Sequence, residues 1–482
     1  MSTITADIRI QELCPYDARE SIPEKLLVRP YSFFLDSVAG QFNGARYSFL
    51  GSDPFLLFTC TGRDITLVQN GREQRLREDP FDAIKRLVGS FTVASAAGLP
   101  PFTGGAVGYF GYDLARVIET IPEKARDDIT VPDCCLGFYS ASIIIDHHQR
   151  KVWIASSGLP EETPSLQRAR ARDEIERITS LLSADSAPPR ACSGKSAPGP
   201  SAALQSQFDR HSYGQAIAAA KHYIAEGDIY QVNLSQRFSC PASISPLALF
   251  NKLRTVSPAP FGAFFNGVDH HIICSSPERF LRISGSRVET RPIKGTRPRG
   301  ATPDEDRQLG DELLASAKDR AELIMIVDLE RNDLGRVCRF GSVYPAELVS
   351  LETHPVVHHL VSTIRGELDD GREHVDCLRA CFPGGSITGA PKIRAMEIIE
   401  ELEPCRRKVY TGSLGYIGFN GESDLNILIR TILHAHDSYY FHVGGGIVAD
   451  SQPDLEYEET LHKGRGIMEA LGMHTGLPVT SG

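Results

Sequence analysis

Several features common in membrane, secreted and nucleic-acid-binding proteins are missing from this chain of 482 residues. No apolar run approaches the roughly 18 residues of a transmembrane helix. The first residues, MSTITADIRIQELCP, lack the apolar core of a signal peptide. The 61 acidic residues outnumber the 51 basic ones, giving a net charge of −10, and no basic run is present. This balance argues against a surface that binds nucleic acid.

A disulfide framework is also missing, because the 11 cysteines are scattered and form no CxxC pair. Their odd number and their scatter fit reduced thiols, so we expect a cytoplasmic protein. Apolar residues make up 41% of the chain and charged residues 23%, which is close to the globular average. Disordered, collagen-like and coiled-coil proteins are therefore excluded.

One segment differs in composition from the rest of the chain. Ser183–Gln207 consists almost entirely of Ala, Ser, Pro and Gly, and such a segment buries too little surface to order itself. We predict that it is a linker between an N-terminal domain, 1–182, and a catalytic domain, 208–482. Both have ordinary domain sizes.

Short apolar runs and amphipathic segments alternate in mixed order along the chain. We predict strands at Leu414–Phe419, Asn426–Leu433 and Tyr439–Val443, a long helix at Asp304–Val327 and a last helix at Asp454–Leu471. Mixed order with hairpin-length connections predicts an α+β fold with antiparallel sheets.

The first candidate for chemistry is acidic. Glu456 and Glu459 lie at i, i+3 on the predicted last helix and therefore share one face, while Glu322 lies in the long helix. Ordinary solvated helix faces are the alternative interpretation. If the carboxylates lay within about 4 Å, each pair would repel by roughly 4 kcal/mol at a surface-like dielectric. A divalent cation would offset this repulsion, and ligands that are all oxygen favour Mg²⁺.

The second candidate is Lys294, in the Gly- and Pro-rich sequence RPIKGTRPRG. It is either a salt-bridge partner or a nucleophile, and a nucleophile needs a pKa lowered by burial or by a cation such as Arg297. Glu278 ends a predicted strand and could act as a general acid if its pKa is raised.

The third candidate is a cradle for an anion. Backbone N–H groups of Gly444, Gly445 and Gly446, the guanidinium of Arg430 and the hydroxyl of Tyr410 together suit a carboxylate. Close backbone packing is the alternative explanation for the glycines. With Mg²⁺, the cradle implies a small anionic substrate.

The motifs of the C-terminal part resemble those of the chorismate-utilising enzymes. They read PIKGTRPRG, ELIMIVDLERNDLGRV, HHLVS, FPGGSITGAPK, GSLGYIG and GGGIVADSQPDLEYEET, and the resemblance extends over Phe208–Met473. The N-terminal part is similar through FLDS and GGAVGYFGYD. The resemblance implies the chorismate-binding fold of anthranilate synthase component I, in which antiparallel sheets pack as a sandwich with flanking helices.

Two positions separate the branches of this family. Anthranilate synthases usually carry alanine where Lys294 stands, whereas lysine is typical of the aminodeoxychorismate synthases. Isochorismate and salicylate synthases usually have a water-activating lysine where this chain has Gln231. The resemblance therefore implies that component I of an aminodeoxychorismate synthase, in the para-aminobenzoate branch of folate biosynthesis, is the nearest match. Component I of anthranilate synthase, in tryptophan biosynthesis, is the alternative.

The resemblance also implies roles for the candidate residues. Mg²⁺, held by Glu322 and Glu459 with Glu456 close by, would bind the ring carboxylate of chorismate. Lys294 would attack C2 while Glu278 protonates the departing C4 hydroxyl, and ammonia would then replace the lysine by attack at C4. The substrate-binding residues implied are Gly295, Thr296, His359, Tyr410, Arg430, Gly444, Gly445, Gly446 and Lys463.

Family members take ammonia from a separate glutamine amidotransferase subunit. No cysteine of this chain lies in a G-x-C-x-G turn, so we expect such a partner, with free ammonium as a substitute. Family members also bind tryptophan in the N-terminal part, as a feedback inhibitor or a structural ligand. FLDS and the segment SPAPF match the lining of that pocket through Ser37, Pro258 and Phe261, although feedback-inhibited members have LLES in place of FLDS.

Overall fold

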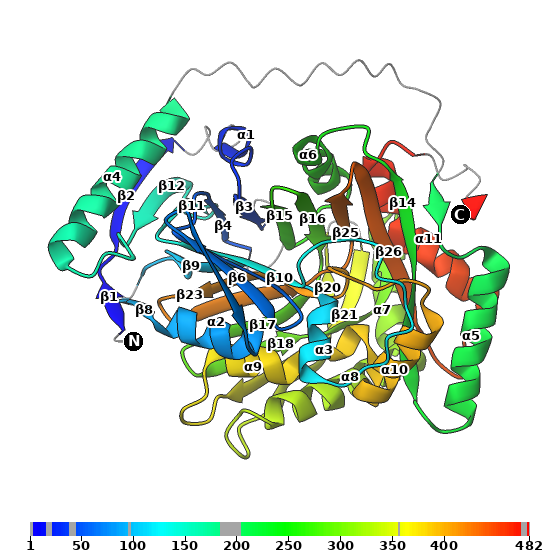
Figure 1. Cartoon of the computed structure of the whole chain (residues 1–482). Coiled ribbons are helices and arrows are strands. Elements are labelled where there is room, and N and C mark those ends of the chain that lie inside the picture. The colour runs from blue at the N-terminus through cyan, green and yellow to red at the C-terminus, as the bar shows by residue number, and fades with distance from the viewer. Residues whose placement is uncertain are drawn as a thin grey trace.

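The computed structural model describes residues 3–15, 22–37, 45–94, 98–183, 204–354, 357–473 and 480–481. Two large sheets, almost entirely antiparallel, form its centre (Figure 1). The 12-stranded sheet contains, in spatial order, β19 (Ile293–Pro298), β21 (Val357–Glu367), β18 (Arg287–Arg291), β17 (Arg279–Ser284), β24 (Glu422–Ile427), β23 (Ser413–Gly418), β9 (Gly105–Phe110), β10 (Cys134–Tyr139), β5 (Leu56–Thr61), β6 (Asp64–Gln69) and β7 (Arg72–Arg77), with β20 (Tyr344–Thr353) beside β21.

The 13-stranded sheet contains β2 (Arg9–Pro15), β12 (Lys151–Ser156), β11 (Ala141–Asp146), β4 (Tyr47–Gly51), β3 (Phe33–Asp36), β15 (Phe261–Asn266), β16 (His270–Ser276), β25 (Thr431–Ala435), β26 (Ser438–Ile447), β14 (Gln231–Pro241), β13 (Gln205–Ser206) and β27 (Thr480–Ser481), with β22 (Gly389–Ala390) beside β14. A separate parallel pair joins β1 (Ile4–Ala6) to β8 (Phe91–Val93).

Helices cover the outer faces of both sheets. They are α1 (Ile22–Leu26), α2 (Pro80–Gly89), α3 (Ala115–Ile118), α4 (Pro164–Ser183), α5 (Arg210–Ala225), α6 (Pro246–Val256), α7 (Pro303–Ala315), α8 (Ala317–Gly335), α9 (His374–Cys381), α10 (Lys392–Leu402) and α11 (Pro453–Ala470). In Figure 1, α1, α4 and α6 lie along the top and α2, α8, α9 and α10 along the bottom, with the sheets between them.

The core has three main layers of apolar side chains. The central one fills the space between the sheets, where Phe33 and Ile144 of one sheet meet Tyr109 and Leu414 of the other. A second layer joins the 12-stranded sheet to α2, α8 and α9, and a third joins the 13-stranded sheet to α4, α6 and α11. The predicted α+β class, with a sandwich of antiparallel sheets and flanking helices, is therefore confirmed.

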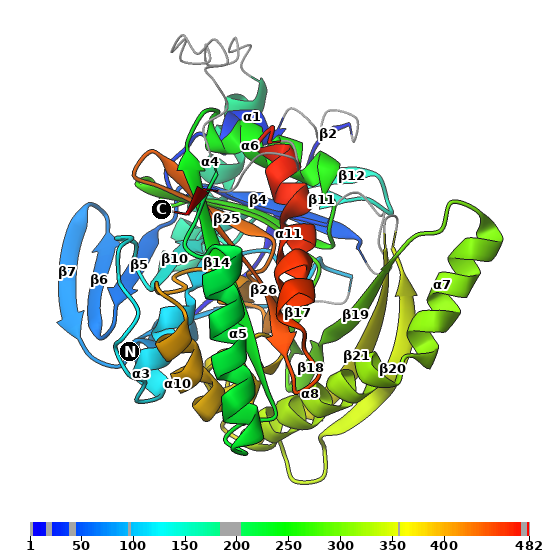
Figure 2. The ribbon, with the colours of Figure 1, turned by 90° about the vertical axis from the view of Figure 1, so that its right-hand side faces the viewer.

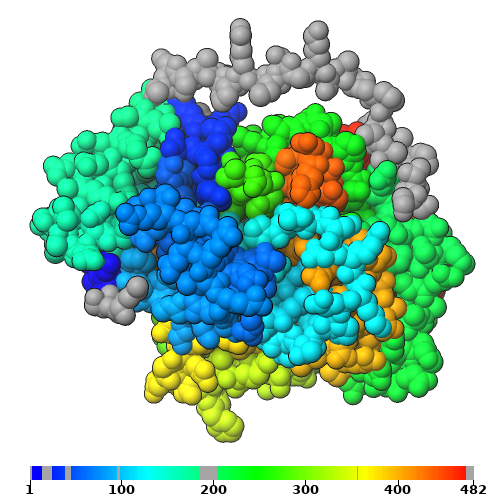
Figure 3. Space-filling view, viewed as in Figure 1, coloured from blue at the N-terminus to red at the C-terminus, as the bar shows by residue number. Residues whose placement is uncertain are grey.

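Both sheets continue from the N-terminal to the C-terminal part of the chain. β3 pairs with β15 in one sheet, and β9 pairs with β23 in the other. Atoms of the two parts accordingly share one continuous surface in Figure 3. Of the predicted linker, residues 184–203 lie outside the described residues, while Gln205 and Ser206 form β13 against β14. The domain division stays a prediction.

The glycine-rich run at Gly104–Asp113 forms β9, in the middle of the 12-stranded sheet. A Cβ atom at Gly105 would collide with the carbonyl oxygen of Ile417, and one at Gly108 with that of Cys135. Glycine is needed here because neighbouring backbones approach too closely for a side chain. These glycines therefore allow the close pairing of β9 with β23, which joins the two parts of the chain.

Two predicted elements were wrong, since each is divided in two. The helix predicted at Asp304–Val327 is broken at Ser316, which ends α7 and caps α8 by accepting a hydrogen bond from the Asp319 amide. The strand predicted at Asn426–Leu433 is broken by Arg430, whose φ is 50°. Its halves, β24 and β25, belong to different sheets, so Arg430 lies where the chain passes from one sheet to the other.

Among the described residues, no helix is both long and apolar enough to cross a membrane. Nine of the described cysteines are free and buried. Burial raises the pKa of several of these thiols, including Cys240 to about 11.

A buried ion pair joins β14 of the 13-stranded sheet to the loop after α10. The guanidinium of Arg407, which is 2% exposed, donates to both oxygens of Glu403 at 2.9 and 2.7 Å. It also donates to the carbonyl oxygens of Ile387 at 3.0 Å and Asn233 at 2.7 Å. Glu403 accepts from the amide and hydroxyl of Ser235. Because both charges are fully used, the network holds three segments in fixed positions.

Replacing Arg407 by methionine should lower the free energy of unfolding by about 3–5 kcal/mol, because Glu403 is left charged, buried and unpaired. Urea unfolding followed by circular dichroism measures this change. Arg75→Met is the matched control, since the Arg75–Glu73 pair is largely exposed, and it should leave the midpoint nearly unchanged. Equal midpoints for the two variants would contradict the assignment.

Candidate active site

Lys294 lies on β19 and its side chain points toward a cluster of charged groups. Its ammonium donates to the carbonyl oxygen of Ser386 at 3.3 Å. Burial lowers the pKa of Lys294, against the raising effect of the nearby Glu322 carboxylate, and Lys463 lowers it further. A lysine in this environment is easier to deprotonate than one in water, which a nucleophile requires.

Glu278 immediately precedes β17 and is 4% exposed. Burial raises its pKa to about 7, although the Ser386 hydroxyl and the Lys294 ammonium both favour the ionised form. A carboxyl group with such a pKa holds its proton near neutral pH and can donate it. Glu278 and Lys294 are thus an acid of raised pKa and an amine of lowered pKa, each shifted toward its neutral form. Their catalytic roles stay predictions.

Of the three predicted metal-binding carboxylates, Glu456 and Glu459 lie on α11 and Glu322 lies on α8. Figure 2 shows α11 lying across β26. The ideal Cβ position at Gly445 is 3.3 Å from both Glu456 Oε2 and Glu459 Oε1. A larger residue there would push these carboxylates away. Glu322 and Glu459 also influence each other electrostatically. The absence of a side chain at Gly445 therefore lets β26 pack closely against Glu456 and Glu459 of α11.

The pKa values of the three carboxyl groups are shifted in different directions. Burial raises the pKa of Glu322 and of Glu456. Burial opposes ionisation of Glu459 too, but Lys463, which pairs with it at 2.7 Å, outweighs this effect and lowers its pKa. Glu456 accepts a hydrogen bond from Ser451 at 2.6 Å.

Among the residues that the structure describes, no three His, Cys, Asp or Glu side chains are grouped closely enough to hold a metal ion. Mg²⁺ needs only one or two carboxylates and takes its other oxygens from water and substrate. The oxygen-only donors beside Gly445 therefore fit this ion.

Gly295, Thr296 and His359 are brought together by the pairing of β19 with β21. The Thr296 hydroxyl lies 3.0 Å from His359 Nδ1, and the Gly295 carbonyl lies 3.4 Å from the same nitrogen. Burial lowers the pKa of His359 to about 4, and the charge of Arg430 adds to this effect. The imidazole is therefore neutral at pH 7, with Arg430 nearby.

The glycines Gly444, Gly445 and Gly446 belong to β26, which runs further than predicted and pairs with β14 along its whole length. The pairing of β26 with β25 extends only to Phe441. The glycines therefore have a neighbouring strand on one side only. The ring of Tyr410 stacks on His442 at 4.8 Å and lies 5.6 Å from the Arg407 guanidinium.

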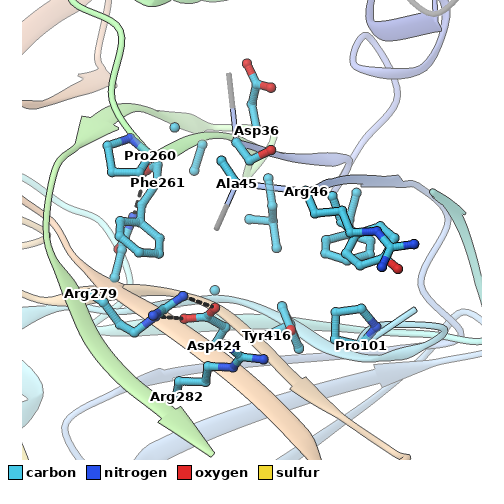
Figure 4. Close-up of a pocket in the computed structure, with 18 of the residues that line it drawn as sticks. Asp36, Ala45, Arg46, Pro101, Pro260, Phe261, Arg279, Arg282, Tyr416 and Asp424 are labelled. Carbon is cyan, nitrogen blue, oxygen red and sulfur yellow. Dashed lines mark hydrogen bonds and ion pairs between the residues drawn. The ribbon is translucent and has the colours of Figure 1, made fainter. Parts of the chain in front are cut away.

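Ser37 and Phe261, two of the three residues predicted to line a tryptophan pocket, lie on a cavity of about 620 Å³. Pro260, rather than Pro258, completes this part of the lining. Figure 4 shows Arg279 bonded to Asp424 across the cavity floor, below Asp36. Tryptophan binding stays a prediction.

The cavity and the Lys294 cluster use opposite faces of the same strands. Pro277, Arg279 and Ile293 line the cavity, while their neighbours Glu278 and Lys294 point to the other face. This alternation is the ordinary period of a strand.

Sequence reasoning missed several groups at the cluster. Ser386, whose carbonyl oxygen accepts a hydrogen bond from Lys294, lies within the FPGGSITGAPK motif. Glu330, a buried carboxyl group that accepts a hydrogen bond from Thr290, lies within ELIMIVDLERNDLGRV. Gln231 was compared with a family lysine but not chosen as a site residue. It is fully buried and its amide has no hydrogen-bond partner among the described residues.

These groups suit acid–base chemistry on a small anionic substrate. The comparisons agree with this class. A family described as chorismate binding enzyme matches residues 33–469. The chain belongs to this family of chorismate-utilising enzymes, as its motifs predicted.

The relatives include two kinds of enzyme. Aminodeoxychorismate synthase component 1 of Bacillus subtilis is 41% identical over 434 residues, which cover 89% of this chain and 90% of the relative. Anthranilate synthase component 1 of Pseudomonas putida is 39% identical over 96% of this chain and 94% of the relative. The crystal structure of anthranilate synthase component I from Streptococcus pneumoniae has a TM-score of 0.77 at 31% identity, covering 88% of this chain and 92% of that one.

The lowered pKa of Lys294 can be measured without any substrate. Acylation by a limiting amount of acetic anhydride, followed by peptide mass spectrometry across pH, reports the neutral fraction of each amine. Because burial favours the neutral form, Lys294 should reach half of its maximal reactivity at a lower pH than the exposed Lys124. A curve at the same or higher pH than that of Lys124 would show that the carboxylates dominate instead.

Proposed function

We propose that this enzyme converts chorismate and ammonia to 4-amino-4-deoxychorismate, in the branch that leads to para-aminobenzoate and folate. The observation that carries the proposal is Lys294, an amine of lowered pKa next to the protonatable Glu278 and the carboxylates Glu322 and Glu459. Anthranilate synthesis requires no nucleophile from the protein at this position. Amination at C4 does require one, because the double bonds of the ring shift and then return to their original positions.

The reaction begins with the neutral amine of Lys294. Its lone pair forms a bond to C2 of the ring as the double bonds shift and the C4–O bond breaks. Glu278 gives its proton to the departing hydroxyl, which leaves as water. Ammonia then forms a bond to C4, the double bonds shift back, and the C2–N bond to Lys294 breaks. The proton released by the attacking ammonia balances the proton taken from Glu278.

The enolpyruvyl carboxylate of chorismate is proposed to lie against Tyr410, Arg430 and the amides near Gly446. Arg430 is half-buried, and burial lowers the pKa of its guanidinium. An anionic group would therefore give it the partner that water would otherwise supply. Thr296 and His359 line the ring, and the neutral His359 adds no positive charge there.

Mg²⁺ held by Glu322 and Glu459, with Glu456 nearby, would neutralise the ring carboxylate of the substrate. The residues of this chain contribute their oxygen atoms and the space beside Gly445. Lys463, which pairs with Glu459, then supplies a second positive charge to the same anionic end of the substrate.

The ammonia is proposed to come from a glutamine amidotransferase subunit. The relatives are named component 1, which supports a second component. Anthranilate synthesis is the competing function, because relatives of both kinds match this chain at similar identity.

Incubation with chorismate, Mg²⁺ and ammonium should give a product with the mass of 4-amino-4-deoxychorismate and no anthranilate fluorescence. Glutamine should replace ammonium only after an amidotransferase subunit is added. Lys294→Ala should abolish most turnover, and Glu278→Gln should reduce it by about 10²–10⁴-fold, the usual contribution of a general acid. Lys124→Ala, at an exposed ion pair, is the control.

Two outcomes would contradict this scheme. Anthranilate as the product would assign the chain to the other activity. Full turnover by Lys294→Ala would leave that residue with a packing or specificity role.

Glu322→Gln and Glu459→Gln should each remove the Mg²⁺ dependence of chorismate binding, because each loses a charged oxygen ligand. Calorimetric titration of chorismate at increasing Mg²⁺ measures this. Glu458→Gln is the matched control on the same helix, since Glu458 pairs with Arg210 at the surface. Unchanged Mg²⁺ titrations in both test variants would remove the metal assignment.

A further inference from the structure

Strand β14 carries a polar face that the proposed reaction leaves unused. Gln231, Asn233 and Ser235 occupy this face because side chains alternate along a strand. Ser235 binds Glu403, as described above. Asn233 is half-buried, and its side-chain oxygen is 3.4 Å from the ideal Cβ position of Gly446, the residue opposite it on β26. Asn233 therefore lies against the glycine segment of the candidate site.

The side chain of Asn233 shares a hydrogen-bond acceptor with Lys294. Asn233 Nδ2 donates to the carbonyl oxygen of Ser386 at 3.0 Å, and Lys294 Nζ donates to the same oxygen at 3.3 Å. A carbonyl oxygen has two lone pairs, so these two donors fill it. Within the described part of the chain, Lys294 Nζ has no second hydrogen bond and no ion pair. Among those residues, the Ser386 carbonyl alone directs the amine by a hydrogen bond.

The short turn that contains Ser386 is held by three successive carbonyl groups. Besides the Ser386 carbonyl, that of Ile387 accepts from the Arg407 guanidinium at 3.0 Å. The carbonyl of Thr388 accepts from the backbone amide of Asn233 at 2.8 Å. A change of side chain at position 233 removes only the first of these three bonds. The turn and its Ser386 carbonyl should therefore keep their place in such a variant.

Sharing one oxygen restricts the amine of Lys294. A neutral amine has two N–H bonds and one lone pair, and donation of one N–H to a fixed oxygen confines the lone pair to directions away from that oxygen. Because Asn233 takes one lone pair of the oxygen, Lys294 can bind only along the other. The Asn233 amide also competes for an acceptor that would otherwise stabilise the ammonium form more strongly. Both effects favour a neutral amine with one orientation.

We propose that Asn233 is a positioning residue for Lys294: its amide occupies one lone pair of the Ser386 carbonyl oxygen and so fixes the direction from which the lysine amine binds there. The hydrogen bonds themselves do not depend on any substrate. Their catalytic consequence rests on the proposed function, in which this amine attacks the ring.

Competitive acylation with acetic anhydride across pH, followed by peptide mass spectrometry, measures the midpoint of Lys294 in the full-length protein without substrate. Asn233→Leu removes the amide donor with little change of size. The ammonium then gains the whole oxygen, so the midpoint should rise by about half a pH unit, roughly a threefold increase in proton affinity. The charged groups that act on the amine stay the same in this variant: Glu278, Glu322, Glu459 and Lys463.

Asn233→Val removes the same donor with a side chain that favours strands, and either folded variant is enough for the measurement. Asn420→Leu is the matched control. Asn420 is also half-buried, but its amide donates to the Pro101 carbonyl at 3.1 Å, which Lys294 does not bind. This variant should leave the Lys294 midpoint unchanged. A midpoint equal to or below that of the wild type in the position-233 variants would overturn the inference.

Hydrogen exchange of the peptide that covers residues 383–390 tests the alternative of a merely structural role. We expect exchange as in the wild type, because the Ile387 and Thr388 carbonyls keep their partners. Faster exchange in the turn together with an unraised Lys294 midpoint would mean that Asn233 only supports the turn, and the inference would be wrong.

Turnover gives a further readout. If chorismate is aminated, Asn233→Leu should lower kcat about tenfold and leave KM for chorismate nearly unchanged, because the amine is misdirected while the groups that bind the substrate remain. A raised KM with an unchanged kcat would contradict a positioning role. A raised midpoint without any chorismate turnover would retain the link between Asn233 and Lys294 and reject the proposed function.

Discussion

The candidate active site holds an amine of lowered pKa, Lys294, among several carboxyl groups. Burial disfavours the ammonium form of Lys294, while Glu322, Glu278 and Glu459 favour it. A protonated Glu278 and the pairing of Glu459 with Lys463 both reduce this opposing effect. The low local dielectric makes every one of these interactions stronger than it would be in water. Small displacements of the charged groups would therefore change the reactivity of the lysine.

The strands of the 12-stranded sheet fix the positions of these charged groups. Lys294, Glu278 and Thr290 occupy one face of β17–β19, and the 620 Å³ cavity lies on the other face. The buried Glu403–Arg407 pair anchors the Ile387 carbonyl, at the end of the turn that holds Ser386. Burial of such a pair is costly, but it leaves these segments few alternative positions. The strands β17–β19 thus hold Lys294 in place, and the turn Gly385–Ile387 holds Ser386 beside it.

The evidence for the family comes from most of the chain, whereas the evidence for the specific activity comes from a few residues. The motifs and the fold extend over most of the chain and establish a chorismate-utilising enzyme. In the proposed function, the choice between amination at C4 and formation of anthranilate rests on one side chain, Lys294. Relatives with either activity therefore match the chain almost equally well. A shared scaffold with locally different chemistry explains this.

The sequence by itself determined the α+β class and the family, and it singled out Lys294, Glu278 and the acidic residues as candidates, because composition, periodicity and motif chemistry are local properties. It did not reveal the break at Arg430 or the continuity of both sheets across the two parts of the chain. Periodicity shows which face a residue occupies, but not which distant face it meets. Only the tertiary structure decides that, since strand pairing and helix packing join segments separated by tens to hundreds of residues.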